Sequence, residues 1–290
     1  MRVHYLIGLV TMTIFVSCDK NAGIGDNEGM VLQADRFSAS MEADPLTRTT
    51  LSGYANSDGS YSLLWQSGDA ISIFDGMNTA VYVTADGYSP TADFVRSIGD
   101  INHTASQYVA FYPSTITPSN MVLPASQNHV DNNISEFPMR AVSTNKQLAF
   151  KNLCGIIRLS LKSEENGQVE VASISLSSDK GMSGPFTVGD DQAAIVTGTN
   201  GVVMKCAEPK PLYANANTDF NIIVPQGDYD PLKVKISDGA GSEINLVSEG
   251  AVSVRRNEIT RITLTLAKSS FDTSLETIPI TDSNVDFSER

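Results

Sequence analysis

The first residues with a reactive chemistry lie at the amino end, where a cysteine follows an apolar run. Residues 5–16 read YLIGLVTMTIFV, after an early positive charge at Arg2. A run of this length is shorter than the ~20 residues of a membrane-spanning helix and fits the apolar part of a secretory signal. Ser17 is the small residue that a lipoprotein signal peptidase requires before Cys18. We therefore predict a signal peptide over residues 1–17 and lipid attachment at Cys18. The alternative is an ordinary signal peptide or a short buried helix.

The second reactive position is a peptide bond in a polar loop. Arg48 stands among small residues in the segment DPLTRTT, residues 44–50. Pro45 keeps the preceding chain extended, and the flanking threonines are not bulky. We predict that the chain is cut after Arg48, so that Thr49 becomes the new amino terminus. The alternative is that Arg48 is one basic residue in an ordinary loop.

The segments around these two positions predict a strand that can be removed. Residues 18–29 are polar, contain glycine and lack apolar periodicity, so they form a flexible tether. Residues 30–48 then form a propeptide whose first part is a strand with a bulge near Asp35 and Arg36. The apolar residues of that strand alternate in two phases: Met30, Leu32 and Ala34, then Phe37, Ala39 and Met41.

Other residues that could do chemistry are too scattered to predict a catalytic or metal site. His103 and His129 are isolated, and the sequence holds no nucleophile motif, zinc motif or phosphate loop. Trp65 is the only tryptophan, and its apolar flanks favour a core position over a ligand platform. Cys154 and Cys206 lie in strand-like apolar stretches, which favours two small core residues, with a disulfide as the alternative. We predict no enzyme, cofactor or metal.

Composition and periodicity predict an all-β protein. The chain has 290 residues, 18% of them charged, and a formal net charge of −13, which argues against a nucleic-acid partner. Short alternating apolar runs follow one another every 8–12 residues, separated by turn residues, as in sandwiches and barrels. Among them, residues 108–112 form a continuous apolar run that Pro113 stops. We predict two β-sandwiches, over residues 49–146 and 147–268.

The last segment, residues 269–290, continues beyond the point where a simple sandwich would stop. Its apolar residues provide for one or two short strands and could form a donor strand for another subunit: Leu275, Ile278, Ile280, Val285 and Phe287. The alternative is a tail that folds onto its own domain or stays disordered.

Several short sequence motifs along the chain resemble those of the fimbrillin family, the lipoprotein precursors of type V pilins. The motifs are TRT at 47–49, LWQSGDAISIF at 64–74, YVAFYP at 108–113, LPASQ at 123–127, PMRA at 138–141 and FKNL at 150–153. Each motif alone has little specificity, but the order and spacing of the motifs are similar to those of that family over about residues 1–190. Beyond that range only the β-character and the length agree.

The resemblance implies two tandem transthyretin-like β-sandwich domains and export as a lipoprotein to the outer membrane and cell surface. It further implies that an arginine-specific protease removes the first strand, after which subunits join a fimbrium by donor-strand exchange and serve adhesion. Expected partners are other fimbrial subunits, the outer membrane through the lipid, the protease, and a host or bacterial surface receptor. A competing interpretation is a surface lipoprotein that binds glycan or host protein and never polymerises.

Overall fold

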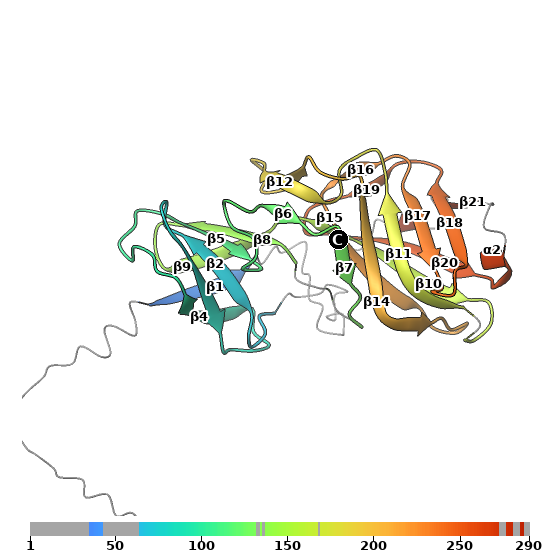
Figure 1. Cartoon of the computed structure of the whole chain (residues 1–290), viewed down its shortest axis with the longest axis horizontal. Coiled ribbons are helices and arrows are strands. Elements are labelled where there is room, and N and C mark those ends of the chain that lie inside the picture. The colour runs from blue at the N-terminus through green and yellow to red at the C-terminus, as the bar shows by residue number, and fades with distance from the viewer. Residues whose placement is uncertain are drawn as a thin grey trace, which may run out of the picture. The chain divides into compact units, whose positions relative to one another are not determined.

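Strands make up nearly all of the regular structure that the computed structural model describes (Figure 1). It describes residues 35–42, 64–131, 134, 137–167, 169–272, 277–280 and 285–286. Within these ranges the single helix is the short α2, Ser269–Asp272. A helix long and apolar enough to cross a membrane does not occur among the same residues. The all-β prediction is confirmed.

The first half is one closed sheet of seven strands in the order β1-β4-β3-β2-β5-β8-β9. Neighbouring strands are antiparallel, except that β1 runs parallel to β9, which closes the barrel. The strands are β1 Arg36–Met41, β2 Ala70–Phe74, β3 Thr79–Thr84, β4 Thr91–Ile98, β5 Tyr108–Tyr112, β8 Met139–Ser143 and β9 Gln147–Asn152.

Two details of this half differ from the sequence-based prediction. A two-sheet sandwich was expected, whereas the hydrogen bonds run unbroken around one sheet. The alternation of inward and outward side chains is the same in both architectures, so periodicity does not separate them. The barrel also includes β9, which begins at Gln147 and therefore lies beyond the boundary we placed after residue 146.

The barrel core is aromatic. Trp65 is fully buried and meets three rings edge to face, with centroid distances of 5.0 Å to Phe94, 5.4 Å to Phe150 and 5.5 Å to Tyr112. Such pairs add stability beyond the area they bury. The prediction that Trp65 is a core residue is confirmed. Gly68, with φ of 93°, forms the turn that follows it and leads into β2.

The second half holds two larger sheets that close on one apolar core. One has the order β15-β10-β20-β22 and the other β21-β18-β17-β11-β14-β7, and both contribute to the same buried cluster. Their strands are β7 Ser126–Asn128, β10 Gly155–Ser163, β11 Glu170–Ser177, β14 Gly201–Pro211, β15 Thr218–Val224, β17 Lys233–Ser237, β18 Glu243–Ser248, β20 Ile259–Leu266, β21 Thr277–Ile280 and β22 Val285–Asp286. Smaller sheets join β13 Ala194–Val196, β12 Gly184–Val188 and β6 Val122–Leu123, and separately β16 Gly227–Tyr229 and β19 Val252–Val254.

The chain between β5 and β8 leaves the barrel and joins the second half. Its strand β6 pairs with β12, and β7 pairs in parallel with β14. Gln127 on β7 is buried, and its amide donates to the Ile223 carbonyl oxygen at 2.7 Å and accepts from the Ile223 N–H at 2.9 Å. The two halves therefore share strands.

Candidate functional site

The predicted sites fall partly outside the described residues. Cys18, Arg48, Thr49, Leu275 and Phe287 all lie there. The propeptide strand lies inside them from residue 35 onward, as β1, Arg36–Met41. This strand is the best-described part of the predicted assembly apparatus, and we call the position it fills between β4 and β9 the β1 slot.

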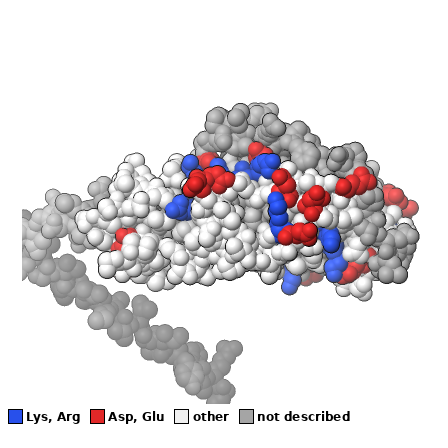
Figure 2. Space-filling view, turned by 90° about the horizontal axis from the view of Figure 1, so that it is seen from above, with Lys and Arg blue, Asp and Glu red and all other residues white. Residues whose placement is uncertain are grey.

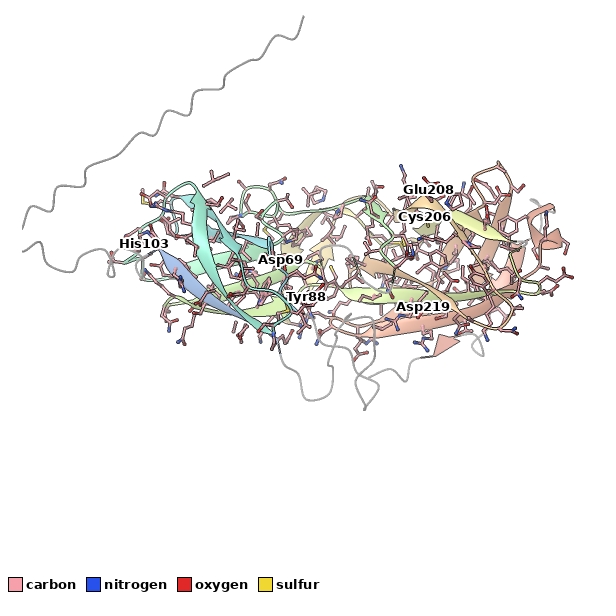
Figure 3. All side chains as sticks on the ribbon, turned by 90° about the horizontal axis from the view of Figure 1, so that it is seen from below. Asp69, Tyr88, His103, Cys206, Glu208 and Asp219 are labelled. Carbon is pink, nitrogen blue, oxygen red and sulfur yellow. The ribbon has the colours of Figure 1, made fainter. Side chains whose placement is uncertain are left out.

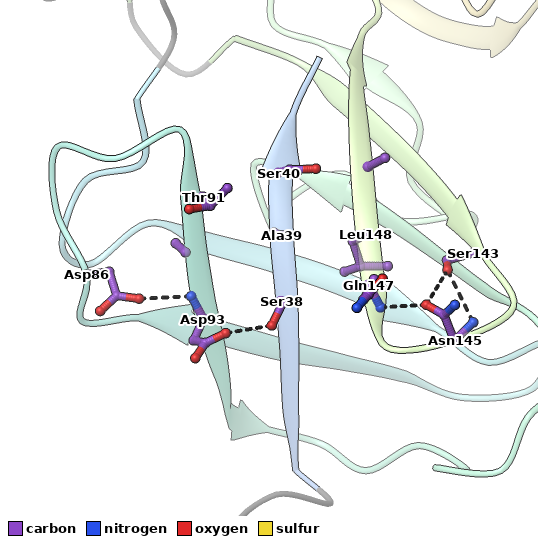
Figure 4. A pocket seen from close by; sticks show the side chains of 12 residues that line it. Ser38, Ala39, Ser40, Asp86, Thr91, Asp93, Ser143, Asn145, Gln147 and Leu148 are labelled. Carbon is purple, nitrogen blue, oxygen red and sulfur yellow. Dashed lines mark hydrogen bonds between the residues drawn. The ribbon is translucent and has the colours of Figure 1, made fainter. Parts of the chain in front are cut away.

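Main-chain hydrogen bonds hold β1 from both sides. It pairs antiparallel with β4, from Arg36 opposite Val95, and parallel with β9, where Met41 lies opposite Phe150. The Ser38 N–H donates to the Lys146 carbonyl oxygen at 2.9 Å. Figure 4 shows β1 running between its two neighbours. Without β1 the barrel would be an open sheet with two unpaired edges, and such edges recruit other strands.

The inward face of β1 belongs to the barrel core. Phe37 is fully buried, and its ring lies edge-on to those of Tyr82 and Tyr108, at centroid distances of 5.1 and 5.0 Å. Ala39 is 2% exposed, and Met41 is partly buried against the same cluster. The phase Phe37, Ala39, Met41 that the sequence indicated is therefore the buried phase.

An ion-pair network surrounds the start of β1. Asp35 accepts a hydrogen bond from Arg96 at 2.9 Å and lies 2.8 Å from Nε2 of His103. Arg36 donates to Asp93 on β4 at 3.0 Å, and both of these side chains are about half exposed. The network ties both the first residue of the strand and the one before it to the barrel.

The end of β1 is tied to the second half of the chain. Both carboxylate oxygens of Glu42 accept hydrogen bonds from the guanidinium of Arg256, at 2.6 and 3.1 Å. The sequence analysis missed this pair, because 214 positions separate its members and the sequence carries no signal that links two such distant charges.

The outward face of β1 is lined by small polar side chains, which leave a surface hollow of about 590 Å³. Ser38 on this face donates to the Asp93 carboxylate at 2.7 Å, as Figure 4 shows. This hydrogen bond, and secondarily the neighbouring Arg36, lower the pKa of Asp93. The ionised state of a residue on β4 is therefore stabilised by residues that belong to β1.

The described part of the carboxyl-terminal segment lies on its own half. Strand β21 pairs in parallel with β18, and β22 pairs antiparallel with β20, each at the edge of a sheet. The predicted donor residues Ile278 and Ile280 are on β21, and Val285 is on β22. Ile280 is 1% exposed and contributes to the second core. These described parts of the segment therefore fold onto their own half of the chain.

Of the remaining candidate residues, only His129 and Cys206 lie near one another, since His129 lies 3.0 Å from Asp131, whose charge adds to burial in raising the pKa of Cys206. Cys154 and Cys206 are free thiols, and burial raises the pKa of both, for Cys206 to about 11. His103 lies in the barrel and Cys206 in the second half, well apart in Figure 3. A group of three potential metal ligands is not found among the described residues. On the face seen in Figure 2, acidic and basic side chains are intermixed.

Comparisons with known proteins give a structural likeness and no family. Neither a family model nor a curated protein matches the chain. It is similar to a protein with a proposed role in cell adhesion from Bacteroides ovatus, at 12% identity and a TM-score of 0.48, over 80% of this chain and 92% of the other. It is also similar to a fimbrial assembly protein from Parabacteroides distasonis, at 9% identity and a TM-score of 0.39, over 79% and 90% of the two chains.

A third similar structure is a fimbrial protein from Bacteroides ovatus, at 9% identity and a TM-score of 0.38, of which 50% is covered by 80% of this chain. The structures that resemble this chain thus include fimbrial and adhesion proteins. Likenesses this distant describe similarity of structure and carry no conclusion about function.

Proposed function

We propose that the chain is a structural subunit of a cell-surface fimbrium with a role in adhesion. In this proposal it is exported as a lipoprotein through Cys18, cut after Arg48 by an arginine-specific protease, and polymerised by donor-strand exchange. Its partners are then other fimbrial subunits, the outer membrane through the lipid, and a surface receptor. The tandem transthyretin-like architecture stays a prediction of the resemblance.

One observation supports this proposal most strongly: the first described strand of the chain is also an interior strand of a closed barrel. Its loss would expose the pocket of Phe37 and the main-chain groups of β4 and β9. Burying one large apolar side chain contributes about 1.5–3 kcal/mol, and the unpaired sheet edges add the cost of unmade hydrogen bonds. A vacated slot therefore binds any strand that matches it.

Cleavage acts as the switch because it changes an effective concentration. While the chain is intact, β1 is tethered to the slot it fills, and a short tether gives an effective concentration in the millimolar range. A strand from another subunit cannot compete at ordinary concentrations. A cut after Arg48 ends this advantage, and β1 then competes as a free segment.

The proposed donor is the carboxyl-terminal segment of another copy. Among the described strands β21 pairs on one side only, so its release breaks one ladder of hydrogen bonds and exposes Ile280, a loss of about 1.5–3 kcal/mol for that side chain. Insertion into the β1 slot would bring partners on both sides. In the exchange, a strand that was hydrogen-bonded to one neighbour becomes hydrogen-bonded to two.

The competing interpretation, a surface lipoprotein that binds glycan or host protein, would use the polar hollow beside β1. It requires no cleavage and no strand release. A glycan-binding protein would therefore bind its ligand as the intact precursor, and this difference separates the two interpretations.

The proposal is tested by treating the purified precursor with an arginine-specific protease and following SDS-resistant ladders. We expect ladders from the wild-type chain, none from Arg48→Ala, and ladders from the control Arg36→Ala. Removal of residues 275–290 should abolish them if this segment is the donor. Complete cleavage after Arg48 without ladders or filaments would contradict the proposal, as would surface-sheared protein that begins only at Cys18.

A further inference from the structure

The end of the β1 slot carries a cation that the departure of β1 would leave without its partner. Arg256 lies in the turn between β19 and β20 and is 19% exposed, and Glu42 is 13% exposed. The two side chains form a forked pair, with both guanidinium ends donating to the carboxylate. The Asn152 N–H also faces a Glu42 carboxylate oxygen, at 3.3 Å. Among the described residues Glu42 is the carboxylate in direct contact with Arg256, and Asp191 interacts with the same guanidinium only at longer range, through its charge.

The groups that bind Glu42 belong to parts of the chain that would stay after cleavage. Arg256 donates a further hydrogen bond to the carbonyl oxygen of Asn152, at 3.0 Å, at the end of β9. The neighbouring Asn257 has φ of 64°, donates its N–H to the Cys154 carbonyl oxygen at 2.9 Å and accepts from the Asn152 side chain. A Cβ at Gly155 would collide with the Arg255 main chain, so the turn packs directly against β10.

We infer that Arg256 and the Asn152 main chain form a carboxylate receptor at the end of the β1 slot, which selects the strands that can replace β1. The receptor is positioned by contacts that do not involve Glu42, so it keeps its shape when the propeptide leaves. A guanidinium fork binds a carboxylate through two parallel hydrogen bonds, which sets position as well as charge. A replacement strand that brings an uncharged residue there would leave a mostly buried cation unpaired.

The replacement strand therefore needs Asp or Glu at the position that corresponds to Glu42. The proposed donor, the carboxyl-terminal segment of a second copy, is rich in such residues. Asp282, Asp286 and Glu289 lie between or beside its apolar residues. Since the carboxylate fixes one end of the strand, it also fixes the register, which an apolar slot alone specifies only by alternation. This inference rests on the proposed function, because it assumes that the slot is vacated.

The test uses the full chain with a site-specific protease sequence between Ala43 and Thr49, nicked in the folded state. Fluorescent peptides of sequence 35–42, amidated at the carboxyl end so that residue 42 brings no second carboxylate, then compete for the slot: the natural peptide, Glu42→Gln, and the control Ser40→Ala, whose change lies on the outward face. We expect the Glu42→Gln peptide to enter about 10- to 100-fold more weakly than the other two. In the nicked Arg256→Gln chain this difference should shrink to about twofold or less.

Equal entry of the natural and Glu42→Gln peptides into the nicked wild-type chain would overturn the receptor and leave strand exchange intact. Entry of no peptide, with nicking complete and Trp65 fluorescence native, would overturn the vacated slot and the receptor together. If Arg256→Gln does not fold, the comparison of peptides on the wild-type chain still decides, because there the substitution is in the peptide alone.

Discussion

Strands β1 and β21 are both short segments near an end of the described chain, but their surroundings differ. Strand β1 lies between two neighbours in a closed barrel, with Phe37 fully buried and ion pairs at both ends. Strand β21 lies at the edge of an open sheet, where β18 is its one neighbour among the described strands, and its residue Ile280 is buried. The first segment completes its sheet, whereas the second extends one.

The difference indicates which of the two strands the folded chain can release at the lower cost. Loss of an edge strand shortens a sheet and leaves one edge in place of another. Loss of an interior strand turns a barrel into an open sheet with two new edges and an empty pocket. Release of β21 should therefore require less free energy than removal of β1 from its slot. This is the combination that strand exchange would need.

The largest effect should follow from Phe37→Ala in the uncut chain. We expect a loss of about 3–5 kcal/mol in the free energy of unfolding, because the substitution removes a ring from a well-packed aromatic cluster. Urea unfolding followed by Trp65 fluorescence measures it. The control Ser40→Ala, on the outward face of the same strand, should change stability by about 0.5 kcal/mol or less. A loss below about 1 kcal/mol for Phe37→Ala would mean that β1 is not an integral strand.

A smaller effect is expected from Ile280→Ala, near the lower limit of about 2 kcal/mol for such truncations, because an edge strand can relax around the cavity. Hydrogen exchange should sharpen the comparison: amides of residues 277–280 should exchange faster than those of β1, since edge strands open locally at lower cost. Protection of β21 equal to that of β1 would remove the difference between the two strands.

The smallest effect concerns pH. The pKa of Asp93 is lowered by Ser38 and Arg36 of β1, so it returns toward its ordinary value of 3.8 when β1 leaves. The stabilisation of β1 is therefore present above the ordinary pKa and is lost as pH falls through the lowered one. Because these side chains are about half exposed, we expect less than about 1 kcal/mol. Release of a nicked β1 should accelerate more in acid for the wild-type chain than for Asp93→Asn. An equal acceleration would show that Asp93 does not contribute.

The sequence predicted local features well, because these depend on neighbouring residues. Residues 108–112 form β5, which ends where Pro113 removes a hydrogen-bond donor. The phase of Phe37, Ala39 and Met41 and the burial of Trp65 followed from alternation and apolar flanks.

Features that depend on distant parts of the chain were not predictable in this way. A barrel and a sandwich need the same alternation, so closure through the parallel pair β1 and β9 gave no sequence signal. The pairing of β6 and β7 with the second half, and of Glu42 with Arg256, joins residues whose local patterns are unrelated. The slot could thus be predicted in outline, whereas the receptor at its end could not.

Because β6 and β7 pair with strands of the second half, the chain can finish folding only in a certain order. When the last strand of the barrel, β9, has been synthesised, β14 and the Ile223 main chain that Gln127 requires still lie downstream. The amino-terminal half therefore emerges carrying two strands with no sheet to join. A chain truncated before β12 is consequently expected to leave both strands unpaired, so the first half needs the second half to complete its fold.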